Sequence, residues 1–356
     1  YNTIFKMTKA NYCGAFVLFF ALAMVYLRRL PSHPSTIAEI EADGGSFVQT
    51  SDGRLIEYFR CGDTRGTDAY FQHGYGNTGK VIFAFPELCL AAEKLHLHLF
   101  SPTQPGFGLS STYPLDTVRT LSEWPADIDL ILQQEQILNF YVSGWSAGCV
   151  HALTIANAYS DRVLGIGIST PTTPLAVEKR TNGNMALPTK FVRNAFPIPY
   201  IGDLLGFLMS LMDGRQRMAA APDVAAALDK MERLGNNDGE EKWQSIVNGF
   251  VTDQNRGMRK GFRGWQDNMA ILNEEVPFDT QTFGAKMQGK NIIITSAADD
   301  TTNPPIMQTW WQEQLPGSEL MQCKVGFAHM HWVDTGVITE LFHRMIGEEA
   351  NHVHVQ

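Results

Sequence analysis

The sequence has few cysteines, and their spacing suits neither a metal centre nor a disulfide framework. Five cysteines are scattered over 356 residues, with no CxxC pair and no Cys/His spacing suited to zinc. No asparagine begins an Asn-x-Ser/Thr sequon, which argues against a heavily glycosylated secreted protein. These absences predict no disulfide scaffold and no structural metal, and they favour a reduced compartment.

Basic charge is also scarce. Lys and Arg total 28 against 37 Asp and Glu, so the formal net charge is −9, and no long run of basic residues occurs. Surfaces that bind nucleic acid or anionic lipid head groups carry clustered positive charge. The sequence therefore predicts no nucleic-acid partner.

A hydrophobic content of 44% is ordinary for a globular protein and excludes a disordered or collagen-like chain.

The longest apolar run lies near the N-terminus. Residues 15–27 are thirteen apolar residues, and Tyr12 extends the stretch of low polarity to sixteen. As a helix, this stretch would measure about 24 Å, slightly less than a hydrocarbon layer of about 30 Å. We expect residues 12–27 to form an uncleaved anchor and the protein to be membrane-associated. The alternatives are a cleaved signal peptide with a soluble mature protein, or a buried core helix.

Strand patterns alternate with helical patterns along most of the chain. This order predicts an α/β fold with a mostly parallel central sheet and helices on both faces. Near-continuous apolar strands such as residues 291–295 indicate burial on both faces. The expected strands are residues 54–60, 69–72, 95–100, 140–142, 163–169, 291–295 and 319–325, and the expected helices are 121–138, 150–159 and 333–346.

The alternation stops between residues 171 and 289. This stretch has no convincing strand and contains helical patterns at residues 201–212 and 222–234. We interpret it as a helical cap inserted into the sheet domain. The predicted division is an N-terminal segment and linker (1–43), a core in two parts (44–170 and 290–348), the cap (171–289) and a tail (349–356).

The strongest motif is Gly144-Trp145-Ser146-Ala147-Gly148, a G-x-S-x-G pattern between a predicted strand and a predicted helix. Such a turn exposes the serine hydroxyl, and glycines on both sides remove Cβ atoms that would clash with neighbouring elements. The helix N-terminus also brings backbone N–H groups close to the reacting oxygen. The motif predicts a nucleophile elbow. The alternative is a Gly-rich turn whose serine only caps the helix.

With this motif the chain resembles the α/β-hydrolase fold superfamily over roughly residues 51–347. It is most similar to the capped serine hydrolases of that superfamily, in the company of esterases and lipase-like acylglycerol hydrolases. The resemblance implies the sheet and cap architecture described above. Epoxide hydrolases and haloalkane dehalogenases of the same fold carry a carboxylate at the elbow, and Ser146 argues against both.

The resemblance implies that an acidic residue follows a late strand. The family pattern G-x-x-D-x-x-x-P, placed after residues 291–295, puts Asp300 at the acid and Pro304 at the proline, with Ala297 in place of the glycine. Asp299 is the alternative acid. A third interpretation is a solvated acidic turn that caps the next helix.

The family places its histidine after the last strand, usually as Gly-His. Residues 326–332 occupy that position, and Ala328-His329 is the better match. His329 is therefore the expected general base, with His331 as the alternative. A histidine in this loop could equally be an ordinary polar residue, but His329 follows Asp300 by 29 residues, in the order that the family uses.

Two backbone N–H groups are expected to bind the oxyanion. The resemblance assigns one to Ala147, the residue after the nucleophile, and the other to Tyr75 in the sequence His73-Gly74-Tyr75-Gly76. The alternative for the second loop is a Gly-rich turn without a catalytic role.

The expected activity is hydrolysis of a carboxylic ester through an acyl-enzyme, with Ser146, Asp300 and His329 as the triad and with no cofactor and no metal. Leu and Met side chains in residues 201–212 predict a lipophilic small-molecule substrate. Two alternatives stay open: a non-catalytic ligand-binding or scaffold protein on this fold, and a peptidase or lyase that uses the same triad.

Overall fold

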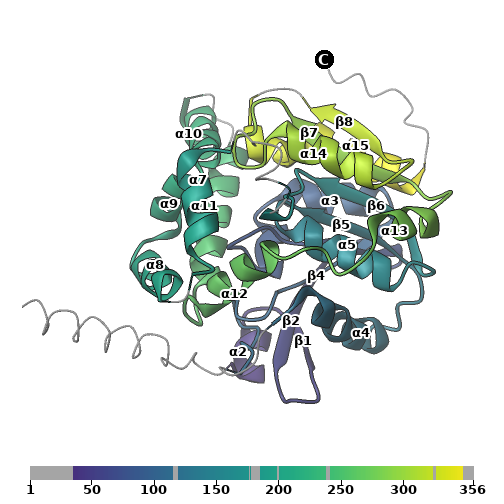
Figure 1. Ribbon diagram of the computed structural model, residues 1–356, viewed down its shortest axis with the longest axis horizontal. Coiled ribbons are helices and arrows are strands. Elements are labelled where there is room, and N and C mark those ends of the chain that lie inside the picture. The colour runs from purple at the N-terminus through teal and green to yellow at the C-terminus, as the bar shows by residue number, and fades with distance from the viewer. Residues whose placement is uncertain are drawn as a thin grey trace, which may run out of the picture.

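An eight-stranded sheet forms the centre of the computed structural model, which describes residues 35–347 except 115–118, 176, 178–184, 199, 238–240 and 324–325. The strand order is β1-β2-β4-β3-β5-β6-β7-β8 (Figure 1). The strands are β1 (Ser46–Gln49), β2 (Leu55–Gly62), β3 (Thr67–Gln72), β4 (Leu97–Pro102), β5 (Phe140–Trp145), β6 (Val163–Ser169), β7 (Ile292–Ala297) and β8 (Glu319–Cys323).

The sheet is mostly parallel, as the sequence predicts. β2 pairs antiparallel with β1 and with β4, whereas every pairing from β4 through β3 to β8 is parallel. All six residues of β7 are buried, because helices cover both of its faces. The carboxyl ends of β3, β5 and β6 are neighbours in this order, so the loops that follow them meet at one edge of the sheet.

Helices pack on both faces and produce two main core clusters. Tyr70 and Phe71, neighbours on β3, point to opposite faces, and each joins a different cluster. Leu88 and Leu341 lie in the cluster of Phe71, whereas Ile128 and Trp311 lie in that of Tyr70. The helices concerned are α3 (Pro86–Lys94) and α15 (Thr335–Ile346) on the first face, and α4 (Trp124–Gln134), α5 (Gly148–Ala158) and α14 (Pro305–Gln314) on the second.

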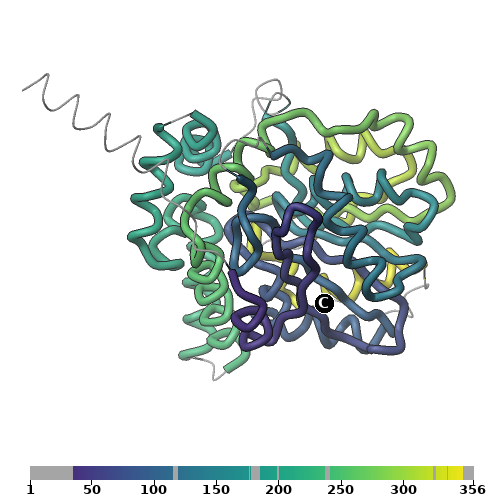
Figure 2. The backbone as a smooth tube through the Cα atoms, turned by 90° about the horizontal axis from the view of Figure 1, so that it is seen from below, coloured from purple at the N-terminus to yellow at the C-terminus, as the bar shows by residue number. Residues whose placement is uncertain are grey.

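In the described part of the chain between β6 and β7, every regular element is a helix and no strand occurs. Most of these helices gather at one side of the sheet, at the left of Figures 1 and 2, whereas α13 returns to the sheet. They are α7 (Leu187–Ala195), α8 (Ile201–Ser210), α9 (Gly214–Arg217), α10 (Pro222–Asn237), α11 (Glu241–Gly257), α12 (Arg263–Leu272) and α13 (Thr280–Lys286). The remaining elements are α2 (Ile37–Ala42) and the 3₁₀ helices η1 (Gly79–Phe83), η2 (Leu121–Glu123), η3 (Met218–Ala220) and η4 (Ala328–Val333).

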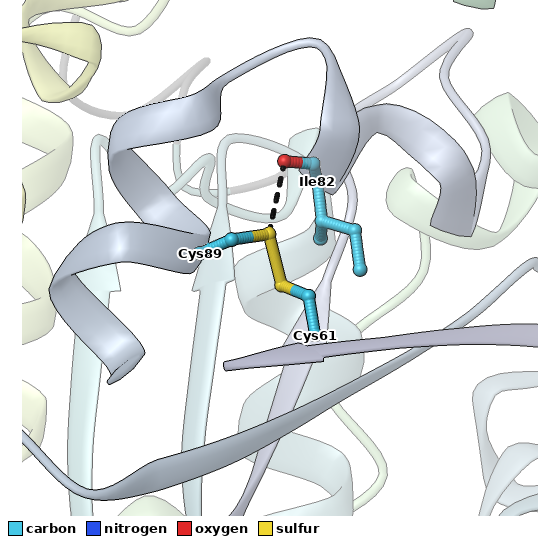
Figure 3. Close-up of a disulfide and its surroundings, with 3 residues drawn as sticks. All are labelled: Cys61, Ile82 and Cys89. Carbon is cyan, nitrogen blue, oxygen red and sulfur yellow. Dashed lines mark hydrogen bonds between the residues drawn. A yellow bond between two sulfur atoms is a disulfide. The ribbon is translucent and has the colours of Figure 1, made fainter. Parts of the chain in front are cut away.

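A disulfide corrects the expectation drawn from the cysteines. Cys61 at the end of β2 is bonded to Cys89 on α3, with their Cα atoms 5.5 Å apart (Figure 3). The carbonyl oxygen of Ile82 lies 3.5 Å from Cys89 Sγ. The two cysteines are 28 positions apart and share no recognisable motif, so their pairing depends on the packing of α3 against β2. The inference of a reduced compartment, which rested on the absence of disulfides, loses its basis.

The predicted membrane localisation is also corrected. In residues 35–347, outside the gaps given above, no helix has both the length and the apolar character that crossing a bilayer requires. Residues 12–27, on which the anchor and the cleaved-signal alternative both rested, lie outside the described residues, as does the predicted tail at 349–356. The membrane anchor is therefore withdrawn.

Candidate active site

Ser146 lies in the sharp turn between β5 and α5. Its φ of 56° is a left-handed conformation that a residue with a side chain rarely adopts. A Cβ atom added at Gly148 would lie 2.4 Å from the carbonyl oxygen of His73, so only glycine fits at that position. The amide of Ser146 donates to the carbonyl of Ser169 at 2.9 Å, which ties the turn to β6. The predicted elbow geometry is present.

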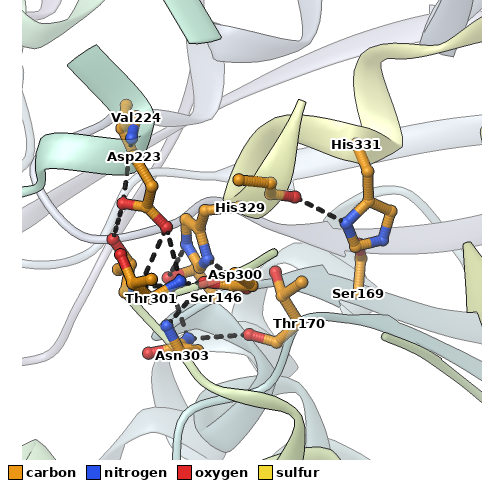
Figure 4. Close-up of polar contacts among 12 residues, drawn as sticks. Ser146, Ser169, Thr170, Asp223, Val224, Asp300, Thr301, Asn303, His329 and His331 are labelled. Atoms are coloured by element: carbon orange, nitrogen blue, oxygen red, sulfur yellow. Dashed lines mark hydrogen bonds and ion pairs between the residues drawn. The ribbon is translucent and has the colours of Figure 1, made fainter. Parts of the chain in front are cut away.

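A continuous chain of hydrogen bonds links Ser146 to two side chains from distant segments. Ser146 Oγ lies 2.8 Å from His329 Nε2, and His329 Nδ1 lies 2.9 Å from Asp300 Oδ2 (Figure 4). Asp300 follows β7, and His329 is in η4, after β8. Only 2% of each of these two residues is exposed, compared with 8% of Ser146. The hydroxyl therefore faces the open side of an otherwise buried chain.

The second oxygen of Asp300 is fixed by backbone amides. Asp300 Oδ1 accepts hydrogen bonds from the N–H groups of Thr302 at 2.9 Å and Asn303 at 2.7 Å. Asn303 Nδ2 in turn donates to the carbonyl of Thr170 at 2.7 Å, beside the elbow. These bonds fix the orientation of the carboxylate toward His329.

Burial and the neighbouring charge set the protonation of this pair. Burial raises the pKa of Asp300 to about 6, although the adjacent imidazole opposes the rise. Burial alone would lower the pKa of His329, but the carboxylates of Asp300 and Asp223 outweigh it and leave that pKa above its usual 6.5. At a pH above both values, Asp300 is ionised and His329 is neutral, and a neutral imidazole can accept a proton.

The two alternative residues lie in other hydrogen bonds. Asp299 Oδ2 accepts from the amide of Gly326 at 2.7 Å, so this carboxylate braces the loop before η4. His331 Nε2 lies 2.8 Å from Thr295 Oγ1, and burial lowers the pKa of its imidazole to about 4. The structure thus brings Asp300 and His329 to Ser146, whereas His331 lies apart from them (Figure 4). Asp299 bonds to Gly326 instead.

The loop of Tyr75, expected to supply an oxyanion donor, is held by side chains of α11. Asp253 Oδ2 accepts from the Asn77 side-chain amide and from the Thr78 backbone N–H, both at 2.9 Å. Gln254 Nε2 donates to the carbonyl of Tyr75 at 3.3 Å. Burial raises the pKa of Asp253 to about 6. Sequence reasoning missed Asp253 and Gln254, which lie more than 170 positions from the loop and carry no motif.

A cavity of about 130 Å³ opens beside the serine. Ser146, His329, Tyr75 and Ala147 line it together, so the two expected oxyanion residues border the same space as Ser146. Most of the remaining wall is apolar and comes from the helical chain between β6 and β7. Its main apolar side chains are Met185, Val192, Met209, Met218, Val224, Phe250, Trp265, Met269 and Leu272.

Two arginines contribute to the mostly apolar wall. Arg217 is 3% exposed, and its guanidinium donates to the carbonyl of Gln254 at 2.7 Å and to that of Met209 at 3.3 Å. Arg193 donates to Thr172 Oγ1 at 3.0 Å. These bonds join α9 to α8 and α11, and join α7 to the loop that follows β6. The described residues contain no group of three or more His, Cys, Asp or Glu side chains that could hold a metal ion.

The fold and the site define a hydrolase of the α/β class. A family model described as alpha/beta hydrolase fold matches residues 70–333, and the chain belongs to that family. No curated protein matches this sequence. Solved structures of esterases and other alpha/beta hydrolases share this fold at low sequence identity.

Three solved structures illustrate that similarity. The esterase RhEst1 from Rhodococcus sp. ECU1013 has a TM-score of 0.59 and 15% identity, over 85% of this chain and 98% of that one. MGS-M2, an alpha/beta hydrolase enzyme from a Medee basin deep-sea metagenome library, has a TM-score of 0.59 and 16% identity, over 87% and 100%. The esterase EaEST from Exiguobacterium antarcticum has a TM-score of 0.53 and 16% identity, over 84% and 97%. At these identities the likeness shows the fold.

Proposed function

We propose that this protein is a serine hydrolase that cleaves carboxylic esters through an acyl-enzyme. The observation that carries the proposal is the unbroken hydrogen-bond chain from Ser146 Oγ to His329 at 2.8 Å and from His329 to Asp300 at 2.9 Å. A serine hydroxyl is a weak nucleophile at neutral pH and needs an adjacent base, which a third group orients. Family membership and the esterase neighbours support the same reaction class.

In the first half of the reaction, Ser146 Oγ attacks the ester carbonyl carbon while His329 Nε2 takes the hydroxyl proton. The charge that develops on His329 is stabilised by Asp300. The carbonyl oxygen becomes an oxyanion, and the backbone N–H groups of Ala147 and Tyr75 are the proposed donors to it. His329 then gives its proton to the departing alkoxide, and the acyl group remains on Ser146.

Water completes the cycle. His329 removes a proton from a water molecule, which attacks the acyl carbon to give a second tetrahedral intermediate. When the bond from the acyl carbon to Ser146 Oγ breaks, His329 returns the proton to Oγ, and the acid is released. The proposed residues carry out all of these proton transfers without a cofactor.

The apolar wall beside Ser146 supports a lipophilic small-molecule ester as the substrate. Methionine side chains are flexible and polarizable, so a wall that includes Met185, Met209, Met218 and Met269 can adapt to acyl groups of different shape. We also propose that residues 171–289 form a cap. The absence of strands from their described part and their contribution to the cavity wall support this assignment.

The test is covalent labelling with a fluorophosphonate, followed by hydrolysis of p-nitrophenyl esters of increasing acyl length. We expect the wild type to be labelled and Ser146→Ala to lose labelling with an unchanged circular dichroism spectrum. Ser143→Ala is a control on β5, the strand that precedes Ser146, because the hydroxyl of Ser143 donates to the carbonyl of Tyr70 and does not line the cavity. A wild type that resists labelling would favour a non-catalytic binding protein, and hydrolysis of amides but not esters would favour a peptidase.

A further inference from the structure

Asp223 is a carboxylate close to the triad that comes from a different part of the chain. It lies in the first turn of α10, between β6 and β7, and is partly buried. Figure 4 shows its side chain directed toward the loop of Asp300, next to His329. Neither the G-x-S-x-G motif nor the family patterns for the acid and the base involve this residue.

The carboxylate of Asp223 is bonded to the loop that carries Asp300. Asp223 Oδ2 accepts from the backbone N–H groups of Thr301 and Thr302, both at 2.9 Å, and Oδ1 accepts from the Thr302 hydroxyl. The same Thr302 N–H lies 2.9 Å from Asp300 Oδ1. The N–H group of Thr302 is thus shared by the two carboxylates. A displacement of Asp223 would therefore also shift the loop that holds Asp300.

The same helix also holds the segment that carries His329. Lys230, two turns further along α10, donates from Nζ to the carbonyl of Gly326 at 3.0 Å. Its ammonium lies 4.5 Å from the centre of the Phe327 ring. Helix α10 therefore contacts both loops whose side chains must meet at Ser146.

Charge adds to these contacts. Two carboxylates act on His329 from separate elements: Asp300 from the loop after β7 and Asp223 from α10. Burial raises the pKa of Asp223, but the charge of His329 and the Thr301 and Thr302 bonds outweigh it and leave that pKa below its usual value. His331, the other titratable group of η4 near the site, is neutral at neutral pH because burial lowers its pKa to about 4.

We propose that Asp223 is a positioning residue for the hydrolytic reaction, which holds the Asp300 loop in place and supplies a second negative charge to the protonated His329. The inference rests on the proposed function, because it concerns the step in which His329 takes the proton of Ser146. If Asp223 has this role, catalysis depends on the contact of α10 with the loops that follow β7 and β8. A chain in which α10 is displaced would keep its triad side chains but lose their alignment.

The test measures the rate of fluorophosphonate labelling of Ser146 from about pH 5 to about pH 9, a range that spans the titration of histidine. Asp223→Asn keeps an oxygen for the Thr301 and Thr302 amides but removes the charge. Because protonated His329 cannot accept the serine proton, the rate falls on the acid side. Without the charge of Asp223, the pKa of His329 is lower, so this acid limb should move to lower pH by about one pH unit.

Asp223→Ala removes the hydrogen bonds as well, and its labelling rate at neutral pH should fall roughly ten- to a hundredfold. Asp279→Asn is the matched control, since Asp279 also accepts a backbone N–H at a helix start, on α13, without acting on His329. The control should retain the wild-type pH profile.

An acid limb that stays in place in Asp223→Asn overturns the proposal, even if Asp223→Ala is inactive because it misfolds. A wild type that is not labelled at any pH overturns the proposed function instead. The two failures are therefore distinguishable.

Discussion

Two regions of the molecule form the site. The sheet and its loops position the hydrogen-bonded side chains, and the helices between β6 and β7 supply most of the cavity wall. The sheet half places Ser146, Asp300 and His329 at the carboxyl ends of its strands, where hydrogen bonds of 2.8 and 2.9 Å join them. The helices contribute most of the cavity wall. On the proposed function, the sheet therefore positions the reacting groups, and the helices supply most of the surface that would select the substrate.

The two regions are not independent, because two carboxylates on the helices accept hydrogen bonds from loops that follow strands of the sheet. Asp223 of α10 binds the loop of Asp300, and Asp253 of α11 binds the loop of Tyr75. Asp223 is partly exposed and its pKa is lowered, whereas Asp253 is fully buried and its pKa is raised to about 6. The first is thus an ionised contact beside His329, and the second is a buried brace away from it.

The largest expected effect on kcat/KM concerns the side chains that the sheet positions beside Ser146. Asp300→Asn and His329→Gln should each lower kcat/KM for a p-nitrophenyl ester by about 10⁴-fold, because the serine loses its oriented base. Asp299→Asn and His331→Gln are the matched controls, since these side chains bond to Gly326 and Thr295 instead of the triad. Steady-state kinetics of the four variants decides the assignment, and equal losses within either pair would contradict it.

A smaller effect is expected where the helices brace the sheet. Asp253→Ala removes the acceptor of the Asn77 and Thr78 bonds, so the loop of Tyr75 should shift and kcat should fall roughly a hundredfold. Asp253→Asn keeps an oxygen acceptor at the same position and should stay within about tenfold of the wild type. Kinetics and a crystal structure of each variant provide the check. A kcat of Asp253→Ala equal to that of the wild type would show that the Asp253 bonds are not needed for catalysis.

Asp253→Asn should also change the dependence of stability on pH. The pKa of this carboxyl is about 6 in the folded protein, against 3.8 as its ordinary value. Between these values the unfolded chain is ionised while the folded protein holds the proton, so the free energy of unfolding falls as pH rises through this window. Urea unfolding at several pH values should show a shallower fall in Asp253→Asn, and an unchanged slope would contradict the buried, protonated state.

The smallest expected effect concerns substrate choice. Met209 on α8 lines the cavity, whereas its neighbour Leu208 is 47% exposed and does not. Met209→Lys should lower kcat/KM for medium-chain esters roughly tenfold, because it puts a charge where the acyl chain would bind. Leu208→Lys, the same chemical change one position away, should stay within about twofold. Equal effects of the two variants would argue against an acyl site at this wall.

The sequence predicted correctly those elements whose conformation depends on residues close together in the chain. The apolar run at residues 163–169 coincides with β6, and the G-x-S-x-G turn has the left-handed serine that the motif requires. The helix expected over residues 121–138 instead begins as η2 and ends at Gln134, since Gln136 adopts a φ of 56°, which a helix cannot continue through. Helix α3 was not predicted.

Contacts between distant segments could not be predicted in the same way. Asp299 and Asp300 are adjacent and chemically identical, and only the path of the chain after β7 decides which of them faces His329. Asp223 and Thr302 are 79 positions apart, and the Cys61–Cys89 pair has no spacing signature. Each depends on how separate elements pack, which one sequence read along its length does not reveal.

The order of the three hydrogen-bonded side chains along the polypeptide has a consequence for its synthesis. Ser146 emerges from the ribosome first, and His329 follows 183 positions later. A nascent chain that has formed the turn of Ser146 but not yet His329 carries a hydroxyl with no imidazole to activate it, and a chain terminated before His329 would be inert for the same reason. On the proposed function, reactivity requires the chain up to His329, so activity reports that translation has passed that residue.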